Sequence, residues 1–274
     1  SCRSKRKRCT VNAFRRIGSV FVLILSLALA PTAYASDDPP MATDGAQPSA
    51  QQGTATEFII APYLLFPTLS GTTTIRGLPL DVDLGTGEIF ENLEFAFMGY
   101  FEVRRDKWGF AFDVLYMDLE KEATFEGPIG TAAATLGMQQ GMYELSGIYR
   151  AADWADVVFG VRINNVKGQY ETHRLQLRGE DSYTWADPFV GARLFVPDIG
   201  KWRVGARIDF GGFGVGSTYA FQVYPTVGYD FADWFTLSGG FRLLKMKYET
   251  GEGTQLFVYD MSTYGPFVGF VFRL

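Results

Sequence analysis

The sequence predicts an all-β fold: a single transmembrane antiparallel up-and-down β-barrel of about ten strands. Three observations lead to this prediction. From residue 57 to the end, apolar and polar residues alternate with a period of two, which is typical of strands with one apolar face. The connections between these segments are alternately short and long, as in outer-membrane barrels. Four of the five tryptophans stand at the exit of a short connection.

The first 35 residues have the features of an export signal. The apolar run Val20–Ala30 is too short to span a bilayer as a helix, and Ala33-Tyr34-Ala35 has the small residues that a signal peptidase requires. The run follows a positively charged region that contains Arg3, Lys5, Arg6, Lys7, Arg8, Arg15 and Arg16. The sequence therefore predicts a signal peptide over residues 1–35, cleaved after Ala35.

The chain that remains after cleavage is acidic and has no cysteine. Removing seven positive charges from a net charge of −5 leaves −12, which argues against a nucleic-acid partner. Cys2 and Cys9 leave with the signal, so no disulfide is expected. Residues 36–56 are polar and rich in Pro, Ala and Gln, and are expected to form a disordered periplasmic tether. The barrel is expected to occupy residues 57–274.

Ten alternating segments are expected to form the strands. Short connections lie at 105–107, 152–153, 197–201 and 232–233, and longer loops are expected at 67–92, 121–138, 171–182, 212–217 and 249–254. Within the first long loop, Glu88–Leu93 could form one helical turn, with Ile89 and Phe90 folding into the barrel mouth as a cap. The ten segments lie near 57–66, 93–105, 108–120, 139–151, 154–170, 183–196, 202–211, 218–231, 234–248 and 255–274.

The apolar face of these strands is expected to point outward. Ten strands with four to six large apolar side chains each would overfill a small lumen, which argues against a water-soluble ligand-binding barrel. With the aromatic face in lipid, every backbone group must be paired, so the sheet must close. The tryptophans at the short turns would then form an aromatic girdle at one membrane interface, made of Trp108, Trp154, Trp202 and Trp234.

Four prolines stand within the expected strands, on the apolar face. They are Pro62, Pro188, Pro225 and Pro266. Because proline has no backbone N–H, we expect bulges or skipped hydrogen bonds at these positions.

The chain resembles the small outer-membrane β-barrel proteins of Gram-negative bacteria, among them uncharacterised members. The resemblance covers residues 57–274 and is carried by the signal peptide, the two-residue repeat, the tryptophan girdle, segments such as Asn92–Arg105, and the last strand. It implies a bacterial outer-membrane location. It also implies recognition of the last strand by the barrel-assembly machinery, although Leu274 stands where the family has an aromatic residue.

The opposite face of the strands carries arginines and carboxylates, which are expected to point into the lumen. Three of the arginines recur in a Gly-Φ-Arg pattern, where Φ is apolar, at Gly160–Arg162, Gly205–Arg207 and Gly240–Arg242. The guanidinium fork can bind carboxylates on neighbouring strands. The expected lumen charge network consists of Glu94, Glu102, Arg104, Asp113, Glu144, Arg150, Arg162, Arg193, Arg203, Arg207, Asp209, Arg242 and Arg273.

No residue pattern indicates catalysis, a cofactor or a metal. His173, the only histidine, stands near Ser182 and the acids Glu180 and Asp181, but neighbours on a loop are seldom a catalytic unit. Asp81, Asp83 and the other loop acids lack ligand spacing. The glycine-rich segment 211–217 joins strand to strand without the following helix that phosphate binding needs.

We therefore expect a monomeric, non-enzymatic outer-membrane protein with a structural or surface role. Its lumen is expected to be filled by the arginine–carboxylate network, and its partners are expected to be outer-membrane lipids. Two alternatives stay open. One is a narrow porin-like channel for small solutes, favouring anions through an arginine-lined constriction. The other is an outer-membrane hydrolase that uses His173.

Overall fold

The computed structural model describes residues 56–75, 78–127, 130–172, 178–197 and 199–274. The predicted signal peptide, nearly all of the predicted tether, and His173 lie outside these residues. Within them, no helix is long and apolar enough to cross a membrane.

Twelve strands follow one another along the described part of the chain, with a single α-helical turn between the third and fourth. The elements are β1 (Glu57–Leu65), β2 (Thr68–Ile75), β3 (Leu78–Leu84), α2 (Thr86–Glu91), β4 (Leu93–Arg105), β5 (Trp108–Gly127), β6 (Gly130–Ala152), β7 (Ala155–Thr172), β8 (Arg178–Val196), β9 (Trp202–Gly211), β10 (Tyr219–Ala232), β11 (Phe235–Thr250) and β12 (Phe257–Arg273), with a 3-10 turn at Gly253–Gln255.

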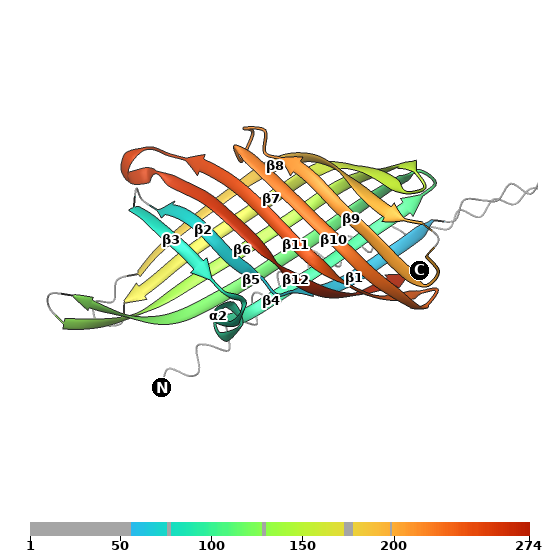
Figure 1. Cartoon of the computed structure of the whole chain (residues 1–274). Helices are drawn as coiled ribbons and strands as arrows, with labels where there is room; N and C mark the ends of the chain where they lie inside the picture. The colour runs from blue at the N-terminus through green and yellow to red at the C-terminus, as the bar shows by residue number, and fades with distance from the viewer. Residues whose placement is uncertain (1–55, 76–77, 128–129, 173–177, 198) are drawn as a thin grey trace, which may run out of the picture. The chain divides into compact units, whose positions relative to one another are not determined.

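Ten of these strands close into an antiparallel barrel (Figure 1). From β4 to β12 each strand pairs with the next in the chain, and β1 pairs with both β4 and β12. The last residue is tied into the closure, because the Leu274 amide donates to the Phe58 carbonyl at 2.9 Å and the Leu274 carbonyl accepts from the Phe58 amide at 3.0 Å. The predicted all-β, up-and-down barrel of about ten strands is confirmed.

The expected loop 67–92 is wrong for most of its length, because it contains β2, β3 and α2. β2 continues β1 along the same neighbour: β12 pairs with β2 over Tyr264–Val258 and with β1 over Arg273–Phe267. β3 pairs back onto β2. The helical turn expected at Glu88–Leu93 is present as α2, and Ile89 is buried there at 1% exposure. Phe90 stacks on Phe66 with ring centroids 5.3 Å apart.

The expected loop 121–138 is also wrong, since β5 runs to Gly127 and β6 begins at Gly130. Here 20 residues of β5 pair with β6 in continuous register, from Trp108↔Tyr149 to Gly127↔Gly130. The connection expected over 171–182 is shorter as well, because β7 ends at Thr172 and β8 begins at Arg178. The barrel therefore has a short-turn end and an end where long hairpins extend, which we call the long-loop end.

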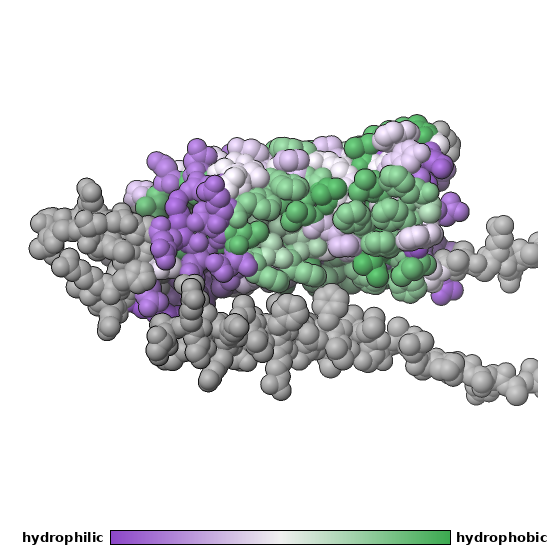
Figure 2. Space-filling view, turned by 90° about the horizontal axis from the view of Figure 1, so that it is seen from below, coloured by the Kyte–Doolittle hydropathy of each residue, from purple (hydrophilic) through white to green (hydrophobic). Residues whose placement is uncertain are grey.

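Large apolar side chains cover the outside of the barrel. On β7, for example, Val157, Phe159, Val161 and Ile163 are exposed, whereas Val158 and Arg162 between them are buried. Figure 2 shows hydrophobic residues over the middle of the barrel and hydrophilic residues gathered at the long-loop end. The alternation predicted from the sequence therefore places the apolar face outward.

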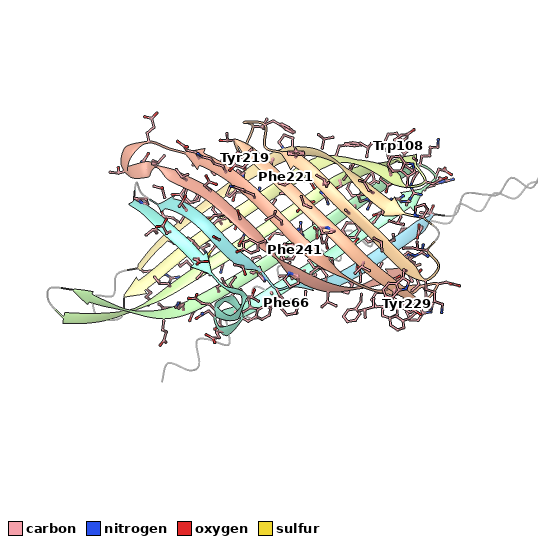
Figure 3. All side chains as sticks on the ribbon, in the orientation of Figure 1. Phe66, Trp108, Tyr219, Phe221, Tyr229 and Phe241 are labelled. Atoms are coloured by element: carbon pink, nitrogen blue, oxygen red, sulfur yellow. The ribbon has the colours of Figure 1, made fainter. Side chains whose placement is uncertain are left out.

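The four tryptophans of the predicted girdle lie on the outer surface at the short-turn end. Each is more than half exposed: Trp108 59%, Trp154 56%, Trp202 53% and Trp234 58%. Aromatic neighbours join them, including Tyr149 against Trp108 at 4.8 Å and Tyr229 against Trp202 at 5.2 Å between ring centroids. Trp108 and Tyr229 mark this end in Figure 3.

The prolines interrupt the ladders without shifting the register. Pairing of β10 with β11 is skipped between Val223 and Thr226, beside Pro225, and pairing of β1 with β12 is skipped between Ile60 and Tyr63, beside Pro62. Pairing of β12 with β1 and β2 is likewise skipped between Phe267 and Tyr264, beside Pro266, and the β8–β9 ladder ends at Phe189, next to Pro188.

Glycine at position 160 is required by a close approach between strands. A Cβ built there would lie 1.9 Å from the backbone oxygen of Leu145 on β6. At Gly168, on the same strand and at the same parity, no atom lies within 4 Å of such a Cβ. The inner wall is therefore tight at Gly160 and open at Gly168.

Replacing Gly160 by Ala is expected to lower the free energy of unfolding by about 1–3 kcal/mol, because the strand must shift to admit a methyl group. Gly168→Ala is the matched control and is expected to change it by about 0.5 kcal/mol or less. Urea unfolding of the refolded proteins in detergent measures both. Equal stability of the two variants would contradict the close approach.

Candidate functional site

The lumen contains a central cluster of three arginines and three carboxylates. Glu144 on β6 accepts from Arg162 Nε at 2.8 Å, from Arg207 Nη2 at 2.8 Å and from Arg242 Nη2 at 3.3 Å. Asp209 pairs with Arg162 at 2.8 Å and with Arg207 at 2.9 Å. Glu144, Asp209 and Arg162 are fully buried. The cluster thus connects strands that are not neighbours in the sheet, such as β6 and β11.

Polar and aromatic side chains complete this cluster. Arg242 pairs with Asp113 at 3.1 Å, and the Tyr63 hydroxyl donates to Asp113 at 2.9 Å while accepting from Arg242 at 3.0 Å. Gln222 accepts from Arg242 Nε and donates to Asp209, both at 3.0 Å. The formal charges balance at three positive and three negative, as buried charge requires.

The Gly-Φ-Arg pattern in the sequence identifies all three arginines of the central cluster. In each repeat the glycine lies where a Cβ would collide with a backbone oxygen of the adjacent strand: 1.9 Å at Gly160, 2.7 Å at Gly205 and 2.1 Å at Gly240. The small residue thus allows close strand approach two positions before each buried guanidinium. Arg162 and Arg207 also lie 5.1 and 5.2 Å from the centroid of the Phe189 ring.

A second charge cluster lies nearer the short-turn end. Asp156, fully buried, accepts from Arg104 and Arg193 at 2.8 Å and from Arg150 at 2.6 Å. Glu102 accepts from Arg104 and Arg193, also at 2.8 Å, and from the Tyr100 hydroxyl. Arg193 on β8 therefore reaches across the lumen to β4.

At the short-turn rim, Asp230 accepts from Arg203 at 2.6 Å and lies 3.5 Å from Arg273. The Arg203 side chain is 60% exposed, whereas the arginines of the two clusters deeper in the lumen range from 0% to 36%. Arg273 also donates to the Thr236 hydroxyl at 2.8 Å. This rim is the part of the charge network that is most accessible to water.

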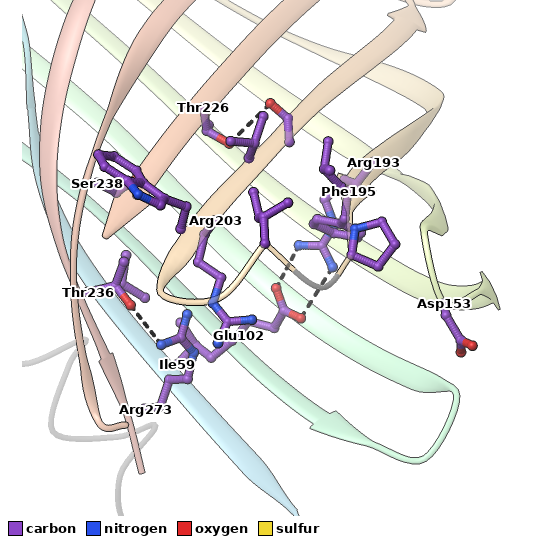
Figure 4. Close-up of a pocket in the computed structure, with 18 of the residues that line it drawn as sticks. Ile59, Glu102, Asp153, Arg193, Phe195, Arg203, Thr226, Thr236, Ser238 and Arg273 are labelled. Atoms are coloured by element: carbon purple, nitrogen blue, oxygen red, sulfur yellow. Dashed lines mark hydrogen bonds and ion pairs between the residues drawn. The ribbon is translucent and has the colours of Figure 1, made fainter. Parts of the chain in front are cut away.

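A cavity of about 970 Å³ opens between the rim and the second cluster (Figure 4). Arg193, Arg203 and Glu102 line one side of it, and the hydroxyl groups of Thr226, Thr236 and Ser238 line another. Gly205 and Gly228 form part of its wall. Phe195 on β8 contributes an apolar surface. The short-turn half of the lumen is therefore a water-accessible vestibule.

The long-loop half of the lumen is filled by apolar side chains, which we call the apolar core. Aromatic rings stack across it from strands that are not adjacent: Tyr183 on Phe257 at 3.6 Å and Trp185 on Tyr248 at 4.3 Å. The buried members of this core are Leu65, Leu69, Ile89, Met98, Leu115, Met117, Leu119, Met142, Trp185, Ala220, Leu244, Met246, Phe257, Tyr259, Met261 and Phe267.

A buried carboxylate, Asp187, holds the glycine-rich connection after β9. It accepts from the amide of Ser217 at 2.5 Å and from its hydroxyl at 2.8 Å. Asn164 and the Trp185 indole donate to the same carboxylate at 3.0 and 3.2 Å. Asp187 thus anchors this glycine-rich segment inside the barrel.

All eight arginines of the predicted network lie in ion pairs in the lumen or at its rim, as do Glu102, Asp113, Glu144 and Asp209. Glu94 does not. It is the extra residue where the register shifts between Leu93 and Phe95, and its side chain is exposed. Placing Glu94 in the lumen was wrong because a bulge breaks the two-residue parity.

Sequence reasoning missed Asp156, Asp187 and Asp230. Each shares the parity of an arginine on its own strand or its neighbour, so the same rule could have found them. It also missed Tyr63, Tyr100 and Gln222, which connect the charges, because polar neutral residues carry no charge signal.

The other candidate sites form no chemical unit within the described residues. Glu180 pairs with Lys167 at 2.9 Å, and the Ser182 side chain is exposed. Asp81 and Asp83 are exposed as well. Over the described ranges no group of three or more His, Cys, Asp or Glu side chains could hold a metal ion.

Comparison with known proteins identifies the fold. No protein-family model matches the chain, and no curated protein matches it by sequence. Among solved structures, the outer membrane protease OmpT from Escherichia coli aligns with a TM-score of 0.52 at 7% identity, covering 80% of this chain and 97% of OmpT. The translocator domain of the autotransporter NalP from Neisseria meningitidis aligns at 0.46 and 11% identity, covering 82% and 90%. The closed barrel and the OmpT alignment together show that the chain has the fold of an outer-membrane β-barrel.

Replacing Glu144 by Gln is expected to lower the free energy of unfolding by about 3–5 kcal/mol, because three buried arginines lose a shared counter-charge. Glu180→Gln, which breaks the exposed pair with Lys167, is the matched control and is expected to cost less than about 1 kcal/mol. Urea unfolding in detergent gives both values. A Glu144→Gln variant as stable as the control would show that the central cluster is dispensable.

Proposed function

We propose that this chain is an integral protein of the bacterial outer membrane, with a barrel that solutes do not cross and a structural or surface role. The proposal is supported by the apolar outer surface bounded by the tryptophan girdle. An apolar band between aromatic girdles is the outer face of membrane-spanning barrels. Export through residues 1–35 with cleavage after Ala35, assembly through the last strand, and a monomeric state belong to the same proposal.

The proposal of a closed lumen is supported by contacts between side chains from opposite walls of the barrel. Arg242 reaches Glu144, Arg193 reaches Glu102, and Gln140 donates to the Tyr259 hydroxyl at 3.2 Å. The central cluster and the apolar core thus lie in series along the axis. An ion crossing the barrel would have to break both.

We propose that the protein is not an enzyme. A hydrolase would need a nucleophile and a base in hydrogen-bond reach beside a space for substrate. The cavity at the short-turn end is lined by paired arginines and by hydroxyl groups, and among the described residues its carboxylates are Glu57, Glu102 and Asp153. Glu102 is already held by two arginines and Tyr100.

Single-channel recording in planar bilayers tests the closed lumen against the narrow anion-favouring channel. The refolded protein is expected to produce no stepwise current, because no path through the charge cluster and the apolar core is open to a hydrated ion. Steady, anion-selective steps would contradict the proposal and support the channel.

Cysteine accessibility on β11 is the internal control for that recording. With Cys2 and Cys9 replaced by Ser, a water-soluble maleimide is expected to label Ser238→Cys, whose side chain lines the vestibule. It should leave Leu244→Cys unlabelled, because Leu244 is 5% exposed in the apolar core. Both positions share one strand and one parity. Rapid labelling of Leu244→Cys would show that water crosses the core.

A further inference from the structure

The barrel wall is interrupted on one side near the long-loop end. The ladder between β4 and β5 ends at Leu93↔Leu119, and the Glu120 amide then donates to the Asn92 carbonyl at 2.9 Å. Beyond this point β3 continues the ring on the β2 side, but within the described residues no ladder joins β3 to β5. Figure 1 shows α2 at this place, where β3 ends and β4 begins.

A small apolar pocket of about 190 Å³ lies at this interruption. Its floor is formed by Ile89 and Leu119, which are 1% and 8% exposed and belong to the apolar core. Leu136 and Met138 on β6 form its wall, and Leu136 is 37% exposed. The pocket therefore extends from the apolar core to the place where the wall is interrupted.

The mouth of the pocket is polar. Lys121 on β5 forms an ion pair with Glu88 on α2, and their side chains are 50% and 36% exposed. The Asn92 side chain donates to the Glu88 carbonyl at 2.7 Å and fixes the end of α2. An apolar floor beneath a charged mouth is complementary to a lipid molecule, which has an apolar tail and a charged headgroup.

The proposed membrane location sets the depth of this pocket, and the inference rests on it. Outer-membrane barrels have short periplasmic turns and longer extracellular loops, so the long-loop end and its pocket face the outer leaflet. Unpaired strand edges are not tolerated in hydrocarbon, so the last laddered pair, Leu93↔Leu119, bounds the hydrocarbon on this side. The pocket then lies at the level where acyl chains meet headgroups. An ammonium group has three donors, so Lys121 can reach a phosphate oxygen at that level while it keeps its pair with Glu88.

We propose that this pocket binds a segment of an acyl chain from an outer-leaflet lipid, with the headgroup beside Lys121. A dry apolar cavity of about 150 Å³ is large enough to bind benzene. Pockets for whole drug-sized ligands begin at about 300 Å³. The volume of 190 Å³ thus suits part of a chain and excludes a complete cofactor.

Photo-crosslinking tests this inference with the refolded protein in phosphatidylcholine vesicles that contain a phosphatidylcholine with a diazirine-bearing tail. Peptide mass spectrometry is expected to find label at Ile89, Leu119 or Met138. It is also expected to find label at Phe159 and Val161 on the apolar outer surface of the barrel, which we call the belt. Leu136→Trp, which fills the pocket, should reduce pocket labelling about tenfold, because the chain loses the burial of about two methylene groups.

Leu80→Trp is the matched control, since Leu80 is 50% exposed on the β2–β3 hairpin and does not line the pocket. It should leave the labelling pattern unchanged. Label on the belt with none in the pocket would overturn this inference and leave the proposed membrane location standing. Absence of label at both places would contradict the membrane location itself. In a parallel sample, protein–protein crosslinks formed through Lys121 by a bifunctional amine-reactive reagent, together with an unlabelled pocket, would assign the opening to a second copy and also overturn the inference.

Discussion

Backbone pairing around a closed ring is the constraint on which the rest of this structure depends. A strand edge left open in hydrocarbon would expose N–H and C=O groups at a cost of several kcal/mol each, so a sheet that enters a membrane must close. Here the first and last strands meet, and the backbone of Leu274 both donates to and accepts from the backbone of Phe58. Closure gives every strand one outer and one inner face. The ladder breaks where α2 and the β5–β6 hairpin leave the ring, next to the polar long-loop end.

Closure also determines what the inner face can carry. Arg162, Arg207 and Arg242 are almost fully buried in the lumen. A guanidinium stays charged there, so each of them needs a carboxylate beside it. Glu144 and Asp156 each serve three arginines, which ties four or more strands together across the lumen. Glycines at 160, 205 and 240 let the strands approach closely enough for these contacts. Toward the long-loop end, stacked aromatic rings fill the lumen in place of the charge clusters.

The two-residue period was sufficient to predict the barrel, the outward apolar face, the girdle and the arginines of the network, because each depends only on strand parity. Parity failed at Glu94, where a bulge with no sequence signal inserts one residue. It failed at 67–92 and 121–138 because segments such as Thr72–Thr74 and Ala132–Ala134 lack apolar alternation, although they are strands. Contacts across the lumen, such as Tyr183 on Phe257, depend on barrel width and strand stagger, which no single segment encodes.

The assignment of the two faces can be measured along one strand. With Cys2 and Cys9 replaced by Ser, spin labels placed singly at positions 157 to 164 of β7 in vesicles report collision with dissolved oxygen and with a water-soluble nickel complex. High oxygen accessibility is expected at Val157, Phe159, Val161 and Ile163, and low accessibility to both reagents at Val158 and Asn164, giving a period of two. A flat profile, or exposure of the outer set to the nickel complex, would contradict a barrel with its apolar face in lipid.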